Sequence, residues 1–149
     1  MCIRDSWPSA HTSLSVVDSG IDRDLVREFV DACRAEDLKV GFYLSLSDWH
    51  HPDYPAFRDE DRPYQLIAYP RAEPEAWARY LDDLRGQLRE LLTDYGEVAV
   101  LWFDGGWERT APEWRADELE ELIRGLQPDI LINERLPTVG DYTLSLIHI

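Results

Sequence analysis

The chain has 149 residues, 44% of them hydrophobic and 30% charged, which is enough apolar material for one domain with a buried core. It carries 30 acidic and 15 basic side chains, so its formal net charge is −15. This balance argues against nucleic acids and anionic membranes as partners, because phosphate groups are bound by basic surfaces. No apolar run approaches the roughly 20 residues that span a bilayer. Neutral ligands such as sugars are compatible with this composition.

The two cysteines and six tryptophans give further information. Cys2 and Cys33 are far apart in the sequence and do not make a disulfide framework, and we expect a buried thiol at Cys33 because it falls on an apolar helix face. The first residues lack the apolar core of a signal peptide, and the sequence defines neither a compartment nor an oligomeric state. Aromatic residues at 11% exceed what a small core requires, so we expect some to line a binding surface.

The hydrophobic pattern of the first half predicts one helix and one strand. The helix spans about residues 22–37, and Asp22 is available as its N-cap. Its predicted apolar face consists of Leu25, Phe29, Ala32 and Cys33. Residues 39–46 form a β-rich apolar run and therefore predict a buried strand. The long connection 47–73 contains many aromatic residues, and loops of this length in compact domains are usually functional.

The second half repeats the alternation of helix and strand. A helix with a continuous apolar stripe begins at Pro74, and Gly96 suits its C-terminal cap. A second strand ends at Asp104, a helix follows at 116–126, and a third strand is predicted at 130–133. Near-continuous apolar strands that alternate with helices predict an α/β fold with a parallel sheet covered by helices.

The run from Val98 to Gly106 ends in one carboxylate, Asp104, which two glycines follow at once. The glycines allow a sharp turn and leave room beside the carboxylate. Ligands of parallel α/β folds bind at the C-terminal ends of the strands, which makes Asp104 a candidate site residue. The motif alone fits a turn cap equally well.

Each predicted strand delivers polar groups just beyond its C-terminal end. These groups are Ser45, Ser47, Asp48, Trp49 and His50 after the first strand, Asp104 after the second, and Asn133, Glu134 and Arg135 after the third. Parallel strands should bring them to one edge of the sheet, and carboxylates beside aromatic rings suit acid–base or nucleophilic chemistry on a sugar. Trp102 alternates with Asp104, so both should face the same side.

Structural interpretations compete with these functional ones. Asp48 also fits a turn cap, Tyr43 a core position, and Arg135 one half of an ion pair with a neighbouring carboxylate. The adjacent His50 and His51 invite a metal interpretation, but adjacent side chains point apart and disfavour a shared ion. We therefore expect neither a metal ion nor a cofactor.

Three segments with their neighbours resemble the α-L-fucosidases of glycoside hydrolase family 29. They are Gly-Phe-Tyr-Leu-Ser at 41–45 with Asp-Trp-His at 48–50, Leu-Trp-Phe-Asp-Gly at 101–105, and Ile-Asn-Glu-Arg at 132–135 with Gly-Asp-Tyr at 140–142. The resemblance covers residues 7–143. It implies a partial (β/α)8 TIM-like barrel of about three βα units with parallel strands, and retaining hydrolysis of terminal α-L-fucose from glycans or glycosides.

The resemblance also implies roles for particular residues. The aspartate of the family's Trp-x-Asp segment is the nucleophile, which corresponds to Asp104. Substrate-binding roles follow for Tyr43, Trp102, Arg135, Trp49 and His50. The partner would then be a fucosylated carbohydrate. The general acid/base of the family matches no residue here. Glu134 is a weak alternative for it, since it should face opposite to Arg135 along the strand.

Departures from the family suggest an interior piece of a catalytic domain. The family's sugar-binding His-His-Asp-Gly segment has no counterpart, and a full barrel takes about 250 residues. We expect a domain fragment at 7–143 between non-native tails at 1–6 and 144–149. An alternative is a catalytically silent fragment with at most weak sugar binding. A third hypothesis is a metal-dependent sugar isomerase or hydrolase that uses Asp48, His50 and Asp104.

Overall fold

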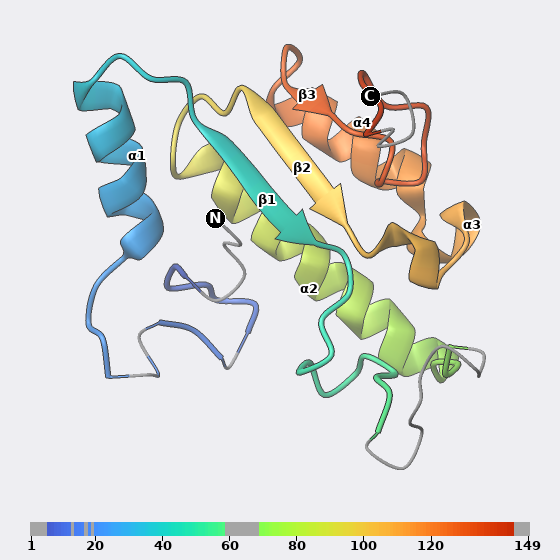
Figure 1. Ribbon diagram of the computed structural model, residues 1–149. Helices are drawn as coiled ribbons and strands as arrows, with labels where there is room; N and C mark the ends of the chain where they lie inside the picture. The colour runs from blue at the N-terminus through green and yellow to red at the C-terminus, as the bar shows by residue number, and fades with distance from the viewer. Residues whose placement is uncertain (1–5, 13, 17, 19, 59–68, 145–149) are drawn as a thin grey trace.

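Three short parallel strands and the helices between them form the described part of the chain (Figure 1). The structure is a computed structural model that describes residues 6–12, 14–16, 18, 20–58 and 69–144. Its elements are α1 (Leu25–Ala35), β1 (Gly41–Ser45), α2 (Pro74–Thr93), β2 (Val100–Asp104), the 3-10 helix η3 (Gly106–Glu108), α3 (Ala111–Trp114), α4 (Ala116–Leu126) and β3 (Leu131–Ile132). The predicted α/β order is confirmed, and η3 and α3 lie where only a loop was predicted.

The strand order is β1-β2-β3, and both pairs of neighbours run parallel. In the register of the first pair, Tyr43 lies opposite Trp102 and Ser45 opposite Asp104. Parallel strands end at the same edge of a sheet. The polar residues that follow the three strands are therefore delivered to a common edge, with β2 in the centre.

Side chains alternate along the strands between a buried face and a half-buried face. Phe42, Leu44, Leu101 and Phe103 are almost completely buried in the core together with the leucines of α2. Figure 1 shows α2 crossing behind β1 and β2. Burying each such side chain stabilises the fold by roughly 1.5–3 kcal/mol. This packing fixes the register and turns Tyr43, Trp102 and Asp104 toward the opposite face.

The predicted apolar face of α1 is wrong by one residue. Val26 and Val30 are the buried residues of this helix, whereas Phe29 is 37% exposed. Two i,i+4 apolar pairs lie side by side on this helix, Leu25 with Phe29 and Val26 with Val30, so periodicity alone does not choose between them. Only the neighbours do, and Val26 N–H donates to the backbone oxygen of Ser6.

The N-cap of α1 is also shifted from the expected position. Asp24, rather than Asp22, caps the helix, and its Oδ1 accepts a hydrogen bond from Arg27 N–H at 2.8 Å. A side chain at the N-cap position reaches the third helical N–H, which only Asp24 does here. Cys33 is a free thiol that packs against the core and is partly rather than fully buried.

The later helices follow the sequence closely. α2 begins at Pro74 as predicted and buries its leucine stripe, and α4 has the predicted bounds. Gly96 lies two residues beyond the C-cap Asp94 with φ +71°, a left-handed conformation that suits glycine. Among the helices of the described residues, none is both long and apolar enough to cross a bilayer.

Several tryptophans belong to the core rather than to a surface. Trp7 and Trp114 are almost completely buried, and Trp77 packs against Trp114 with ring centroids 5.1 Å apart. Tyr54, from the long connection 47–73, stacks into the same cluster. Residues 59–68 of that connection lie outside the described residues. The aromatic residues therefore divide into two groups. Some are buried in the core, whereas Trp49 and Trp107 are exposed.

β3 is shorter than the predicted strand 130–133. At residue 133 the side chain, and not the backbone, forms the hydrogen bonds to β2. Asn133 is fully buried, and its carboxamide pairs with the backbone of Phe103 on β2. The Phe103 N–H donates to Asn133 Oδ1 at 2.8 Å, and Asn133 Nδ2 donates to the Phe103 carbonyl at 2.9 Å. The prediction that Asn133 belongs to the polar groups of the site is wrong, since both its polar atoms serve the sheet.

Replacing Asn133 by Ala should therefore destabilise the fold. The N–H and C=O of Phe103 would lose their buried partners, at a cost of roughly 1–3 kcal/mol for each group. Urea unfolding followed by circular dichroism measures the change. Val139→Ala is the control, because Val139 is almost fully exposed in the same segment and should change stability by less than about 0.5 kcal/mol. Equal stability of the Asn133→Ala variant and the wild type would contradict this role.

Candidate functional site

The carboxylate of Asp104 receives one donor from β1 and one from the segment after β3. Tyr43, on β1, donates its hydroxyl to Asp104 Oδ2, and Arg135, beyond β3, donates Nη1–H to Asp104 Oδ1. The Asp104 side chain is 21% exposed. The structure thus brings together three of the residues predicted for the site. A half-buried carboxylate at a strand end is suited to attack a ligand or to stabilise a developing positive charge.

These donors keep Asp104 ionised. Burial raises the pKa of its carboxyl, but the hydrogen bonds from Tyr43, Arg135 and the Gly105 N–H, together with the Arg135 charge, outweigh burial. The net result is a pKa below the ordinary value of 3.8. Asp104 is therefore a carboxylate at neutral pH.

The two glycines after Asp104 allow neighbouring loops to close over the strand end. Gly105 has φ +75°, and a Cβ there would collide with the Ser47 hydroxyl. A Cβ at Gly106 would collide with the Arg135 carbonyl oxygen, which belongs to backbone and yields little. The turn and the room predicted for these glycines are both present. They let the segments after β1 and β3 reach the carboxylate.

Trp102 and Tyr43 form the aromatic floor beside Asp104. Their rings lie 6.5 Å apart with an interplanar angle of 28°, and Tyr142 meets Trp102 edge-on at 6.4 Å. Trp102 Nε1 and the Tyr142 hydroxyl are buried and have no hydrogen-bond partner within the described part of the chain. Buried polar atoms normally have a partner, so these two atoms are exceptions to that rule.

Glu134 and Arg135 serve different partners although they are adjacent. Arg135 bonds Asp104, whereas Glu134 Oε1 accepts the Leu144 N–H at 2.7 Å. The expectation that these two side chains diverge agrees with these contacts. Glu134 and Asp141 also raise the pKa of the Tyr142 hydroxyl, although burial is the largest cause of that shift.

Trp49 lies at the end of β1 with its indole held by a residue that the sequence analysis missed. Its Nε1–H donates to both oxygens of Glu108, at 3.1 and 3.3 Å. Glu108 is almost fully buried and also accepts the Tyr54 hydroxyl. The sequence signal that could have found it is a carboxylate four residues beyond Asp104, in the turn that follows the two glycines.

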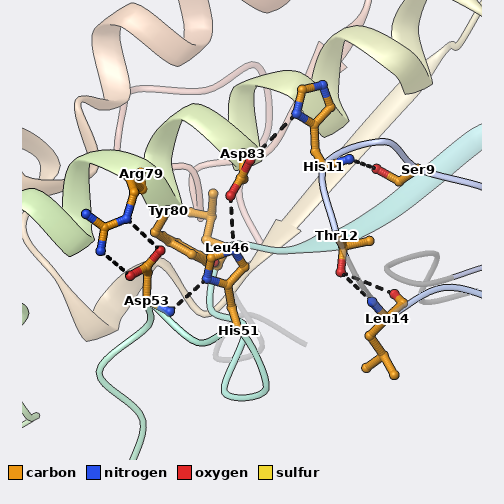
Figure 2. A network of polar contacts seen from close by, with 10 residues as sticks. All are labelled: Ser9, His11, Thr12, Leu14, Leu46, His51, Asp53, Arg79, Tyr80 and Asp83. Carbon is orange, nitrogen blue, oxygen red and sulfur yellow. Dashed lines mark hydrogen bonds and ion pairs between the residues drawn. The ribbon is translucent and has the colours of Figure 1, made fainter.

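His50 and His51 occupy different environments. His50 is exposed, and its backbone N–H donates to Asp48 Oδ1 at 3.0 Å, so Asp48 caps a turn. Figure 2 shows His51 turned toward α2, where its Nε2 lies 3.2 Å from Asp83 and its Nδ1 accepts the Asp53 N–H. The contacts of the His51 ring are with Asp83 and Asp53, while His50 is exposed.

The metal hypothesis for Asp48, His50 and Asp104 gains no support from this geometry. Asp48 caps a turn and Asp104 is held by Tyr43 and Arg135. In the ranges that the structure describes, no group of three or more His, Cys, Asp or Glu side chains is arranged to hold a metal ion.

One cavity lies at the other end of the sheet. It has a volume of about 650 Å³ and is lined by Gly41, Val100 and Leu131, at the beginnings of the strands. Sites in parallel α/β folds form where the strands end rather than where they begin. Asp104 and its partners, and not this cavity, therefore mark the candidate site.

A parallel sheet with helices in its crossovers and a polar site at the carboxyl ends of its strands defines the α/β class, to which the (β/α)8 barrels belong. The sequence model of the alpha-L-fucosidase family matches residues 5–144. The chain belongs to this family, and its three strands are part of a (β/α)8 barrel, as predicted from the sequence.

Individual relatives agree with this assignment. A putative alpha-L-fucosidase 1 of Oryza sativa is 36% identical over 130 residues, which are 85% of this chain and 21% of the rice protein. Alpha-L-fucosidase isoenzyme 1 from Paenibacillus thiaminolyticus is 42% identical, with a TM-score of 0.77, and the match covers 92% of this chain and 35% of that chain. The chain thus spans about a fifth of the rice relative and a third of the bacterial one.

A third relative was solved as a reaction intermediate. It is a GH29 alpha-L-fucosidase from Bacteroides thetaiotaomicron, described as a trapped covalent intermediate in complex with 2-fluoro-fucosyl fluoride. It is 31% identical, with a TM-score of 0.74, and the match covers 92% of this chain and 33% of that chain.

Removing the Tyr43 hydroxyl should raise the pKa of Asp104. Tyr43→Phe deletes one of the bonds that favour the ionised carboxyl, so the stability contributed by this ionisation, which is lost as the pH falls through the folded pKa, should decrease. Carbon-detected NMR of the Asp104 carboxyl across pH measures the shift. Tyr69→Phe, which removes a hydroxyl not bonded to Asp104, is the matched control. An unchanged pKa in Tyr43→Phe would refute the coupling.

Gly106→Ala should destabilise the fold, whereas Gly125→Ala should not. The new methyl at residue 106 meets the Arg135 carbonyl, and overpacking usually costs about 1–3 kcal/mol. Gly125 lies within α4 with nothing near its Cβ position, so Ala should stabilise there by about 0.5–1 kcal/mol. Thermal unfolding of both variants measures the contrast, and equal effects would exclude a close approach at Gly106.

Proposed function

We propose that this chain carries the nucleophile side of the active site of a retaining α-L-fucosidase, which releases terminal α-L-fucose from glycans or glycosides. The observation that carries the proposal is the ionised Asp104, held by Tyr43 and Arg135 at the strand end of a chain from this family. The covalent intermediate described for the Bacteroides relative supports a double displacement, because a covalent glycosyl-enzyme defines the retaining pathway.

In this mechanism Asp104 attacks the anomeric carbon of fucose. The bond from that carbon to the leaving oxygen breaks, and its electron pair departs with the oxygen, which an acid protonates. Water, deprotonated by the same group, then cleaves the glycosyl–Asp104 ester and restores the carboxylate. Tyr43 and Arg135 keep Asp104 ionised between catalytic cycles, because their hydrogen bonds lower the pKa of its carboxyl.

We assign the acid/base to none of the described residues. In retaining enzymes this group lies about 5–5.5 Å from the nucleophile. Glu134, the neighbouring carboxylate in sequence to Arg135, is engaged with the Leu144 N–H instead. The proposal therefore gives this chain the nucleophile alone.

The fucose ring would lie over the aromatic floor of Tyr43 and Trp102. Aromatic faces pack on the apolar C–H faces of sugars. Arg135 supplies further N–H donors. Trp49 and His50, both exposed after β1, complete the proposed contacts with the substrate.

A fluorinated glycosyl fluoride tests the nucleophile without an acid catalyst, because fluoride leaves without protonation. The purified chain should gain one fluorofucosyl group from 2-fluoro-fucosyl fluoride, and peptide mass spectrometry should find it on Asp104. Labelling should persist as the pH is lowered from neutrality toward the ordinary carboxyl range, because the pKa of Asp104 lies below that range.

Matched variants make the labelling test decisive. Asp104→Asn should abolish labelling, whereas Asp82→Asn, at an exposed carboxylate of α2, should leave it intact. Label on another carboxylate, or none on the wild type, would overturn the assignment of Asp104. Measurable hydrolysis of an aryl fucoside by the purified chain would exclude the alternative of a catalytically silent fragment.

A further inference from the structure

Trp107 lies against the guanidinium of Arg135 rather than in the core. The Arg135 Cζ is 5.5 Å from the centre of the Trp107 ring, within the roughly 6 Å at which a ring face attracts a cation. Trp107 is 61% exposed, so its indole removes little apolar surface from water. The contact with Arg135, and not hydrophobic burial, is therefore the interaction that characterises this side chain.

The backbone around Trp107 is held on both sides. Gly106, which precedes it, lies against the segment after β3, since a Cβ there would be 2.0 Å from the Arg135 carbonyl oxygen. The Gly106 carbonyl also accepts the indole N–H of the fully buried Trp114 at 2.8 Å. Glu108, which follows Trp107 in η3, is only 8% exposed. The Trp107 ring therefore reaches Arg135 from a backbone that packing has fixed.

The contact between Arg135 and Asp104 leaves the guanidinium in need of a second constraint. Arg135 Nη1 donates to Asp104 Oδ1, whereas Asp104 Oδ2 accepts the Tyr43 hydroxyl, so the ion pair is not bidentate. Two parallel hydrogen bonds fix the plane of a guanidinium, and one bond does not. A long arginine side chain also loses conformational entropy when it is held in one geometry. The ring face of Trp107 supplies the second contact.

We propose that Trp107 is a positioning residue for the nucleophile, because its ring face holds the Arg135 guanidinium against Asp104. The inference rests on the proposed function, in which Asp104 attacks the anomeric carbon of fucose. Trp107 acts through Arg135 and not on the reacting atoms. Burial opposes the ionisation of Asp104, and the hydrogen bonds from Tyr43 and Arg135 outweigh it, so a guanidinium kept in place keeps the nucleophile charged.

Trp107→Ala removes the ring and leaves the charged groups in place. It should raise the proton-binding constant of the Asp104 carboxyl by roughly 2- to 5-fold, the range that corresponds to a cation–π contact at an exposed site. Carbon-detected NMR across pH measures this constant. The ¹⁵N relaxation of Arg135 Nε should report larger motion in the same variant. A merely structural role of Trp107 would lower the stability in urea and move neither of these signals.

Matched variants separate the ring from its bulk. Trp107→Phe keeps an aromatic face and should retain most of the wild-type behaviour. Leu38→Ala is the control, because Leu38 is 60% exposed and precedes β1, at the other end of the strands from Asp104. If Trp107→Ala does not fold, Trp107→Leu replaces it, since leucine keeps apolar bulk without a ring face. Wild-type values in the variant without a ring would overturn the inference.

A second substitution tests whether Trp107 acts through Arg135. Arg135→Met removes the guanidinium and keeps an unbranched apolar stem. In that background Trp107→Ala should leave the proton-binding constant of Asp104 unchanged, because no cation remains for the ring to hold. An equal increase with and without the guanidinium would show that the ring acts on Asp104 by another route, and would overturn the positioning role.

Labelling by 2-fluoro-fucosyl fluoride connects the position of Arg135 to the reaction. As the pH is lowered, labelling of Trp107→Ala should decline at a higher pH than labelling of the wild type, because protonated Asp104 does not attack. If the wild type is labelled on Asp104 and both proteins decline at the same pH, the inference is overturned and the proposed function stands. If the wild type takes no label on Asp104, the proposed function falls, and the positioning role in the reaction falls with it.

Discussion

The ion pair between Asp104 and Arg135 is the constraint on which this end of the molecule depends. A half-buried carboxylate is costly without partners, and Asp104 obtains them from both neighbouring strands, Tyr43 on one side and Arg135 on the other. This arrangement requires β2 to lie between β1 and β3, which is the observed strand order. The same contacts hold the pKa of Asp104 low, so the contact that joins the strand ends also sets the chemistry.

Two glycines and one asparagine allow the segments around Asp104 to converge. Gly105 and Gly106 remove the side chains that would keep the loops apart, and Asn133 continues the sheet with its carboxamide where the backbone of β3 turns away. The turn then carries Arg135 back to Asp104.

The sequence predicted most of the fold and part of the site. Helix and strand positions followed from apolar periodicity, since α2 and α4 each present one apolar stripe. Periodicity did not identify the buried face of α1, where two neighbouring apolar pairs compete. Asn133 was predicted to be a polar group of the site, but it is buried in the sheet. The sequence did not identify Glu108, because a carboxylate in a turn is usually exposed to solvent. Its burial depends on Trp49 and Tyr54, which are distant in the sequence and bond it in the fold.

By itself the sequence determined that the chain is an α/β domain with carboxylate, arginine and aromatic groups after its strands, because these properties depend on local order and on parallel strands sharing an edge. Only the tertiary structure decided which of these groups meet. Tyr43 and Arg135 are 61 and 31 residues from Asp104, and Trp49 is 59 from Glu108. Contacts over such separations depend on register and loop closure, which packing of the whole sheet against α2 determines.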